Sequence, residues 1–250
     1  MENLFSCAMD IGEQMLISGA EVHRVEESIS RICYALGAKR VDVFIITSSM
    51  VVTIQTEDNK TYTQTRRVVN SNINFERVHL LNQLSREICE KSLTEQEIRE
   101  KFEKAVNCKK YSFWLELVSY AVIAAVFTLF FGGTVIESIV SLFIGAIVRV
   151  ALFLCEKIIS NKIFGKFLST IIITFLAYLS IKVGFITNVD KIIIGNIMTL
   201  IPGIGLTNAL RDLFTGDSIA GLLRSIEAVL TALAIAAGYI LVAFFGGFAL

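Results

Sequence analysis

The pattern of apolar positions changes near residue 110 and divides the chain into two parts. Before that point apolar residues recur at helix or strand spacing among many charged residues. After it they form runs close to the ~20 residues that cross a bilayer. We therefore predict a mainly α-helical membrane protein. A small cytosolic α+β domain should occupy residues 1–110, and a transmembrane helical domain should occupy residues 111–250.

Within residues 1–110 the spacing predicts two amphipathic helices, then two or three antiparallel strands, then two further helices. The helices should contain residues 4–15, 22–36, 75–88 and 98–106, and the strands should lie between residues 40 and 64. Ser18 with Glu21, and Thr94 with Glu97, have the spacing of capping boxes, in which side chains bind free backbone N–H groups at a helix start.

The second part contains five apolar segments that we expect to cross the membrane. They are residues 114–131, 135–154, 167–186, 192–210 and 219–245. Lys and Arg gather before the first segment and after the second, which predicts a cytoplasmic N-terminus. Five crossings would then place the C-terminal tail, residues 246–250, outside.

Two charged residues fall inside the second apolar segment. Glu137 and Arg149 are twelve positions apart, or roughly 18 Å along a helix. They are too far apart to pair with each other, so each should find a partner elsewhere or lie near an interface.

Composition and charge narrow the possible functions. Lys plus Arg and Asp plus Glu each number 23, so the formal net charge is zero. The sequence therefore gives no sign of the basic surface that a nucleic acid partner would require. Residues 1–110 hold 15 basic and 16 acidic residues, against 8 and 7 in the remainder. The five cysteines are scattered without a C-x-x-C pair. We expect no metal site and no bound cofactor.

The stretch from Gly195 to Glu227 is the main candidate for a substrate site. Pro202 and Gly203 break an apolar run there, and a broken membrane helix is tolerated mainly where it lines a cavity or is buried in protein. Arginines could bind a substrate carboxylate, and carboxylates could carry a coupling proton. Alternatively, Arg224 and Glu227 simply pair on one helix face. The candidate residues for substrate binding or coupling are Asn196, Pro202, Gly203, Asn208, Arg211, Asp212, Asp217, Arg224 and Glu227.

The N-terminal part contains a dense polar cluster around His23, which could suggest a catalytic or metal site. The sequence, however, has no nucleophile elbow, H-E-x-x-H motif or phosphate loop to complete one. We therefore predict that the protein is not an enzyme. A membrane-anchored cytosolic enzyme and a ligand sensor remain the alternatives to a transporter.

Two separated motifs resemble those of the threonine/serine exporter family: LISGAEVHRVEESISRICYALGA from Leu16 and PGIGLTNALRDLFTGDSIAGLLRSIEA from Pro202. The chain resembles the larger subunit of the split, two-component form. The resemblance implies proton-driven export of threonine, serine or dicarboxylates such as succinate across the bacterial plasma membrane. It also implies a small, separately encoded membrane partner, and the chain could form a homo-oligomer. The N-terminal motif falls on Gly19, Glu21, Arg24 and Glu26.

Overall fold

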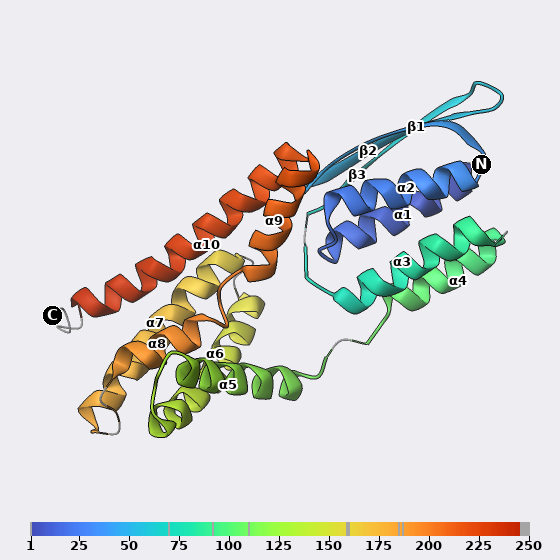
Figure 1. Ribbon diagram of the computed structural model, residues 1–250. Coiled ribbons are helices and arrows are strands. Elements are labelled where there is room, and N and C mark those ends of the chain that lie inside the picture. Colours follow the sequence, from blue (N-terminus) through green and yellow to red (C-terminus); the bar gives the residue numbers. More distant parts are fainter. Residues whose placement is uncertain are drawn as a thin grey trace. The chain divides into compact units, whose positions relative to one another are not determined.

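The structure is a computed structural model that describes residues 2–69, 71–91, 93–109, 111–158, 161–184, 186 and 188–245. It divides into two compact units, whose elements are labelled in Figure 1. The N-terminal unit combines Met1–Lys109 with Ile204–Ser225, and the membrane unit combines Lys110–Gly203 with Ile226–Leu250. Residues 204–225, expected in the transmembrane domain, thus pack with the N-terminal residues.

Two amphipathic helices begin the N-terminal unit, as the apolar spacing predicts. They are α1 (Glu2–Ile17) and α2 (Val22–Ala35). Their apolar stripes face one core, in which Ile11, Met15 and Ile29 are almost completely buried. Burial of such stripes supplies most of the stability of a helix in a small domain.

A three-stranded antiparallel sheet follows in the order β1-β2-β3. The strands are β1 (Ala38–Ile46), β2 (Ser49–Thr56) and β3 (Thr61–Arg67). Val43 lies opposite Val52, and Ile54 lies opposite Tyr62. The side chains of Met50, Val52 and Ile54 alternate into the core, so the alternation of apolar and polar residues correctly predicted the sheet.

Helices α3 (Phe75–Glu90) and α4 (Glu95–Val106) complete the sequence-local part of this unit. The capping box at Thr94 is confirmed: its hydroxyl accepts from the Glu97 N–H at 3.3 Å, and Glu97 Oε2 accepts from the Thr94 N–H at 2.8 Å. The box predicted at Ser18 is wrong. The Ser18 N–H still donates to Gln14 O in the last turn of α1, and α2 starts only after Glu21, whose side chain makes no capping bond.

The N-terminal unit also contains a helical hairpin, residues 204–225, formed by most of α9 (Gly203–Thr215) and the start of α10 (Ser218–Phe245). The turn depends on Gly216, whose φ of 101° is unfavourable for other residues. Gly221 allows the two helices to approach, because a Cβ there would lie 2.8 Å from the Ala209 carbonyl oxygen. Ala220 joins the core of the unit.

The membrane unit is built on long apolar helices. Four helices in the described residues are long and apolar enough to cross a membrane: α5 (Phe113–Phe130), α6 (Val135–Ile158), α7 (Lys162–Lys182) and α10. They correspond to the predicted segments 114–131, 135–154, 167–186 and 219–245. The chain is therefore a mostly helical, multi-pass membrane protein.

The predicted fourth segment, residues 192–210, is not one continuous helix of spanning length, and the break predicted at Pro202 and Gly203 is confirmed. It divides into the short helix α8 (Val189–Ile197) and α9, separated by residues 198–202, and neither helix reaches spanning length. Pro202 and Gly203 separate the two helices, because proline lacks the backbone N–H that a continuing helix requires. The described residues thus contain four helices of spanning length, and the predicted count of five is not matched. The tail itself, residues 246–250, lies outside the described residues.

Small residues allow the helices of the membrane unit to pack closely. A Cβ at Gly145 of α6 would lie 2.8 Å from Ala124 Cβ and 2.9 Å from the Tyr120 carbonyl oxygen of α5. One at Gly195 of α8 would lie 2.2 Å from Thr128 Oγ1. Close contact at small residues is the usual way in which membrane helices associate, since lipid provides no hydrophobic driving force.

Both charged residues of α6 find partners outside their own helix. Arg149 Nε donates to Glu116 Oε2 of α5 at 3.0 Å, and the guanidinium lies over the Phe113 ring. Glu137 accepts from the N–H of Thr134 at 2.7 Å and from that of Asn188 at 2.9 Å. The expectation drawn from their spacing is therefore confirmed.

Candidate functional site

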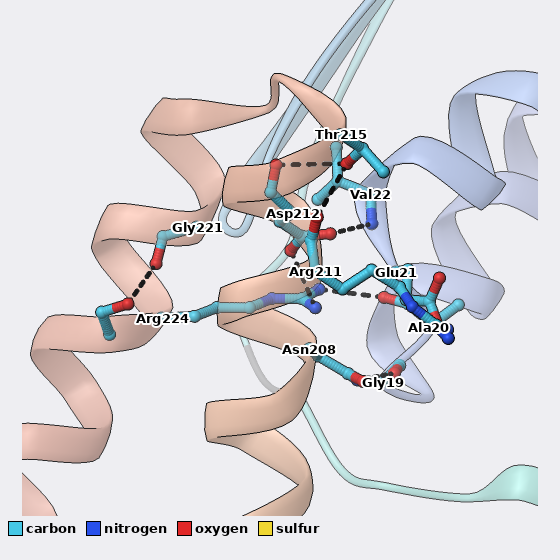
Figure 2. A network of polar contacts seen from close by, with 11 residues as sticks. Gly19, Ala20, Glu21, Val22, Asn208, Arg211, Asp212, Thr215, Gly221 and Arg224 are labelled. Atoms are coloured by element: carbon cyan, nitrogen blue, oxygen red, sulfur yellow. Dashed lines mark hydrogen bonds and ion pairs between the residues drawn. The ribbon is translucent and has the colours of Figure 1, made fainter.

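The two sequence motifs meet inside the N-terminal unit. The turn between α1 and α2, residues 18–21, faces the α9–α10 hairpin, as Figure 2 shows. Gly19 has a φ of 87°, which turns the chain so that backbone carbonyls of the turn can be reached by side chains of the hairpin. Asn208 Nδ2 donates to the Gly19 oxygen at 3.2 Å, and Arg224 Nη2 donates to the Ala20 oxygen at 2.9 Å. We call this set of interactions the turn–hairpin contact.

Asp212 lies at the centre of the turn–hairpin contact and is 0% exposed. Its Oδ1 accepts from the Val22 N–H at 3.3 Å, and its Oδ2 forms an ion pair with Arg224 Nη1 at 3.1 Å, without the alignment of a hydrogen bond. Val22 is the first residue of α2, so Asp212 supplies the acceptor that the Glu21 side chain does not. The partial positive charge at a helix N-terminus favours a carboxylate there.

Arg211 forms the outer part of the contact by pairing with Glu21. Its side chain is 58% exposed, whereas that of Arg224 is only 13% exposed. The two arginines therefore differ in role. Arg224 neutralises a buried carboxylate, and Arg211 presents its guanidinium to solvent.

Further carboxylates lie beside Asp212. Glu26 Oε1 accepts from the Ile45 N–H of β1 at 3.2 Å, and Asp217 has a buried Oδ2 without a hydrogen bond in the described residues. Burial raises the pKa of Glu26, and the negative charge of Asp217 adds to the rise. Burial also raises the pKa of Asp212, against the opposing effect of Arg224. The site thus holds acidic groups that bind protons more readily than ordinary carboxyls.

We expect Glu26→Gln to increase stability at neutral pH. The pKa of Glu26 is higher in the folded state than its value of 4.5 in the unfolded chain, so the folded state holds the proton up to a higher pH. Stability is therefore lost as the pH rises from 4.5 through the folded-state pKa. Glutamine keeps an oxygen for the Ile45 N–H and carries no charge. The Tm of purified full-length protein should rise by about 1–2 °C at pH 7 and stay unchanged at pH 4.5. Glu57→Gln, at an exposed turn position, is the control, and an equal shift at both pH values would contradict the prediction.

Not every predicted site residue belongs to this contact. Pro202 and Gly203 lie at the junction of α8 and α9, and a Cβ at Gly203 would meet nothing within 4 Å. Glu227 is exposed on α10 and falls in the membrane unit. The suggested pair of Arg224 with Glu227 is not the observed one, since the guanidinium of Arg224 binds Asp212 and the Ala20 carbonyl instead. Arg24 is exposed on α2 and takes part in none of the described bonds of the turn–hairpin contact.

Asn196 forms a separate polar centre inside the membrane unit. It is 0% exposed, and its Nδ2 donates to Ser141 Oγ at 2.7 Å and to the Ile192 oxygen at 3.0 Å. The carbonyl partner fixes the amide orientation, because a carbonyl oxygen can only accept. Asn196 Oδ1 is then a buried acceptor that has no hydrogen bond in the described residues. Thr128, also 0% exposed, bonds to Ser141 on its other side.

Sequence reasoning missed the backbone half of the site. The carbonyls of Gly19 and Ala20 and the N–H of Val22 take part through atoms that every residue shares, so no residue type marks them. The Gly19-Ala20-Glu21 run was recognised as a motif, but its partners lie roughly 190 positions away in the chain. A local pattern carries no information about such a pairing.

Comparison with known proteins identifies one family. The family model ThrE, described as "Putative threonine/serine exporter", matches residues 6–246. The match includes both halves of the turn–hairpin contact and the whole of the described membrane unit. No curated protein and no solved structure matches the chain.

Proposed function

Because the chain belongs to the threonine/serine exporter family, we propose that it is a subunit of a secondary exporter in the bacterial plasma membrane. Its substrates are threonine- or serine-like amino acids, or dicarboxylates such as succinate. The proton gradient drives export, and a small, separately encoded membrane subunit completes the transporter. The N-terminal unit lies in the cytoplasm, on the side where Lys and Arg flank the apolar helices. Membership of a transporter family implies that the chain is not an enzyme.

The observation that carries this proposal is the position of Asp212 in the turn–hairpin contact. Its buried carboxylate bonds to α2 and pairs with Arg224 of α10, a helix whose remaining residues, 226–245, belong to the membrane unit. Protonation of Asp212 would remove its negative charge and weaken its ion pair with Arg224. Because Arg224 belongs to α10, the change would affect the helix that continues into the membrane unit. Asp217 and Glu227 are further candidates for the coupling proton.

Two groups are suited to meet the substrate. Arg211 presents an exposed guanidinium, which binds carboxylates through two parallel hydrogen bonds. Asn196 Oδ1 is a buried acceptor that would accept from a substrate ammonium or hydroxyl group. An unsatisfied acceptor is costly in an apolar interior, which favours a functional reason for its presence.

Efflux measurements test the proposed function. Cells preloaded with labelled threonine, serine or succinate would express the chain alone or together with its small partner. We expect efflux of one substrate class only when both subunits are present, and loss of that efflux when a protonophore removes the gradient. Efflux from the chain alone would contradict the two-subunit arrangement. An inserted protein that gives no efflux in either case would contradict export and favour the enzyme or sensor alternatives.

We expect Arg211→Ala to lower efflux at least about tenfold without reducing the amount of protein in the membrane. An exposed ion pair contributes only about 0–1 kcal/mol to stability, so the loss should come from substrate handling. Arg99→Ala is the matched control, because Arg99 forms a similarly exposed pair with Glu95 on α4. Normal efflux by the Arg211 variant, measured per inserted protein, would remove Arg211 from the substrate site.

A further inference from the structure

A surface cavity of about 130 Å³ lies between α2 and α3, outside the turn–hairpin contact. One stripe of each helix lines it. Arg24, Ser28 and Arg31 follow one another at i, i+4 and i+7 on α2, and Asn82 and Arg86 are four apart on α3. Residues at these spacings share a helix face. The cavity is therefore a property of two packed helices rather than of a loop.

The apolar faces of the same helices explain why the polar stripes meet. Val25, Ile29 and Ile32 of α2 are buried in the core, as are Leu81 and Leu84 of α3. These buried faces fix the rotation of each helix about its axis. The neighbouring polar stripes are consequently held opposite each other, and the cavity forms without the help of a ligand.

The charges around the cavity are unequally paired. Arg31 pairs with Glu27 at 2.6 Å. Arg24 and Arg86 have no ion pair in the part of the chain that the structure describes. Two arginines without an ion pair thus line one small cavity, and Glu90 lines it as well. Guanidinium groups bind carboxylates with two parallel hydrogen bonds, and a carboxylate such as Glu90 can bind an ammonium group.

The chemistry of the lining favours binding over catalysis. Its one thiol belongs to Cys89, and burial raises the pKa of that thiol. A raised pKa keeps a cysteine in the unreactive thiol form, whereas a nucleophile needs the thiolate. No histidine lines the cavity. Its volume suits a molecule of a few heavy atoms, because one water molecule occupies about 30 Å³ in the liquid.

We infer that the cavity between α2 and α3 binds a small carboxylate-bearing metabolite through Arg24 and Arg86. As a consequence, the N-terminal unit can sense the class of molecule that the transporter moves. This sensing role rests on the proposed function, but the binding itself does not. The ligand is either an amino acid, with its ammonium group at Glu90, or a dicarboxylate, with one carboxylate at each arginine.

Calorimetric titration of purified full-length protein tests the inference. Threonine and succinate are the two ligands, and succinamide, which has the shape of succinate without its charges, is the control. We expect at least one of the acids to bind at millimolar concentration or tighter, and succinamide to bind at least about tenfold more weakly. Absence of binding by both acids, or equal binding by succinamide, would overturn the inference.

Variants then locate the binding. The double variant Arg24→Ala/Arg86→Ala should weaken acid binding at least about tenfold, and Arg40→Ala/Arg99→Ala, which removes two exposed arginines elsewhere in the unit, should leave it unchanged. Unchanged affinity in the first variant would overturn the site. Efflux assays keep the two proposals apart. If the acids bind but no efflux is seen, the binding site stands and the exporter proposal is refuted. If efflux is seen but the acids do not bind, the exporter proposal stands and the binding site is refuted.

Discussion

Arg224→Ala should destabilise the protein by about 3–5 kcal/mol, the usual cost of removing one partner from a buried ion pair. The remaining partner, Asp212, is 0% exposed, so water could not solvate its negative charge in place of Arg224. The Ala20 carbonyl would also lose its hydrogen bond. We expect the loss to appear as a lower midpoint of denaturant unfolding and as faster proteolysis of purified full-length protein.

Arg211→Ala provides a matched control for this effect. It removes an arginine from the same hairpin, but its partner Glu21 is partly exposed, so the change in stability should stay within about 1 kcal/mol. The double variant Asp212→Asn/Arg224→Gln should recover much of the lost stability, because no buried charge is left unpaired and Asn can still accept from the Val22 N–H. If Arg224→Ala were as stable as Arg211→Ala, Asp212 would not be buried as described.

Gly195→Ala should disrupt the membrane unit. The added Cβ would lie 2.2 Å from Thr128 Oγ1, 2.8 Å from Thr128 N and 2.9 Å from the Ala124 oxygen. Two of these atoms are backbone, and the hydroxyl is held by bonds to the Ala124 oxygen and Ser141 Oγ, so none can move aside cheaply. Overpacking of this kind costs about 1–3 kcal/mol or more. We expect a several-fold lower amount of protein in the membrane fraction and a lower Tm in detergent.

Gly165→Ala is the appropriate comparison. It also replaces a buried glycine inside a long apolar helix, but its nearest neighbour would be Cys155 Cβ at an ordinary 3.7 Å. Alanine favours helix over glycine by about 1 kcal/mol, so this variant should be at least as abundant as the natural sequence. Equal abundance of both variants would show that α5 and α8 are not in the close contact described.

Periodicity was sufficient for the parts of the fold that bury one continuous face. The stripe of α2 and the alternation in β2 each point to a single core, so Ile29 and Val52 could be placed from the sequence. The long apolar helices were equally clear. In the segment 192–210 the break at Pro202 and Gly203 was predicted correctly, but hydropathy did not show what the residues after the break pack against. Residues 204–210 are mostly apolar, yet their helix continues to Asp212, which is buried and bonds to the first residue of α2.

The candidate site was predictable in its residues but not in its arrangement. Asn208, Arg211, Asp212 and Arg224 were selected because polar groups are expensive in an apolar chain, and all four take part in the turn–hairpin contact. Apart from the pair that Asp212 and Arg224 form with each other, their partners could not be inferred, since these are backbone atoms and one glutamate near the other end of the chain. Asn196 was selected with them for the same reason, although it lies in the other unit. Composition identifies costly residues, and only tertiary structure shows which of them meet.

The division of the N-terminal unit between two distant parts of the chain has a consequence for biosynthesis. Residues 2–109 leave the ribosome first, but the carboxylate that caps α2 and the alanine that joins its core belong to residues 204–225. The unit therefore cannot complete its fold until α5, α6, α7 and α8 have been synthesised. Insertion of these helices into the bilayer precedes the final closure of the N-terminal unit, so a chain that stalls during insertion would present that unit to cellular proteases in an unfinished state.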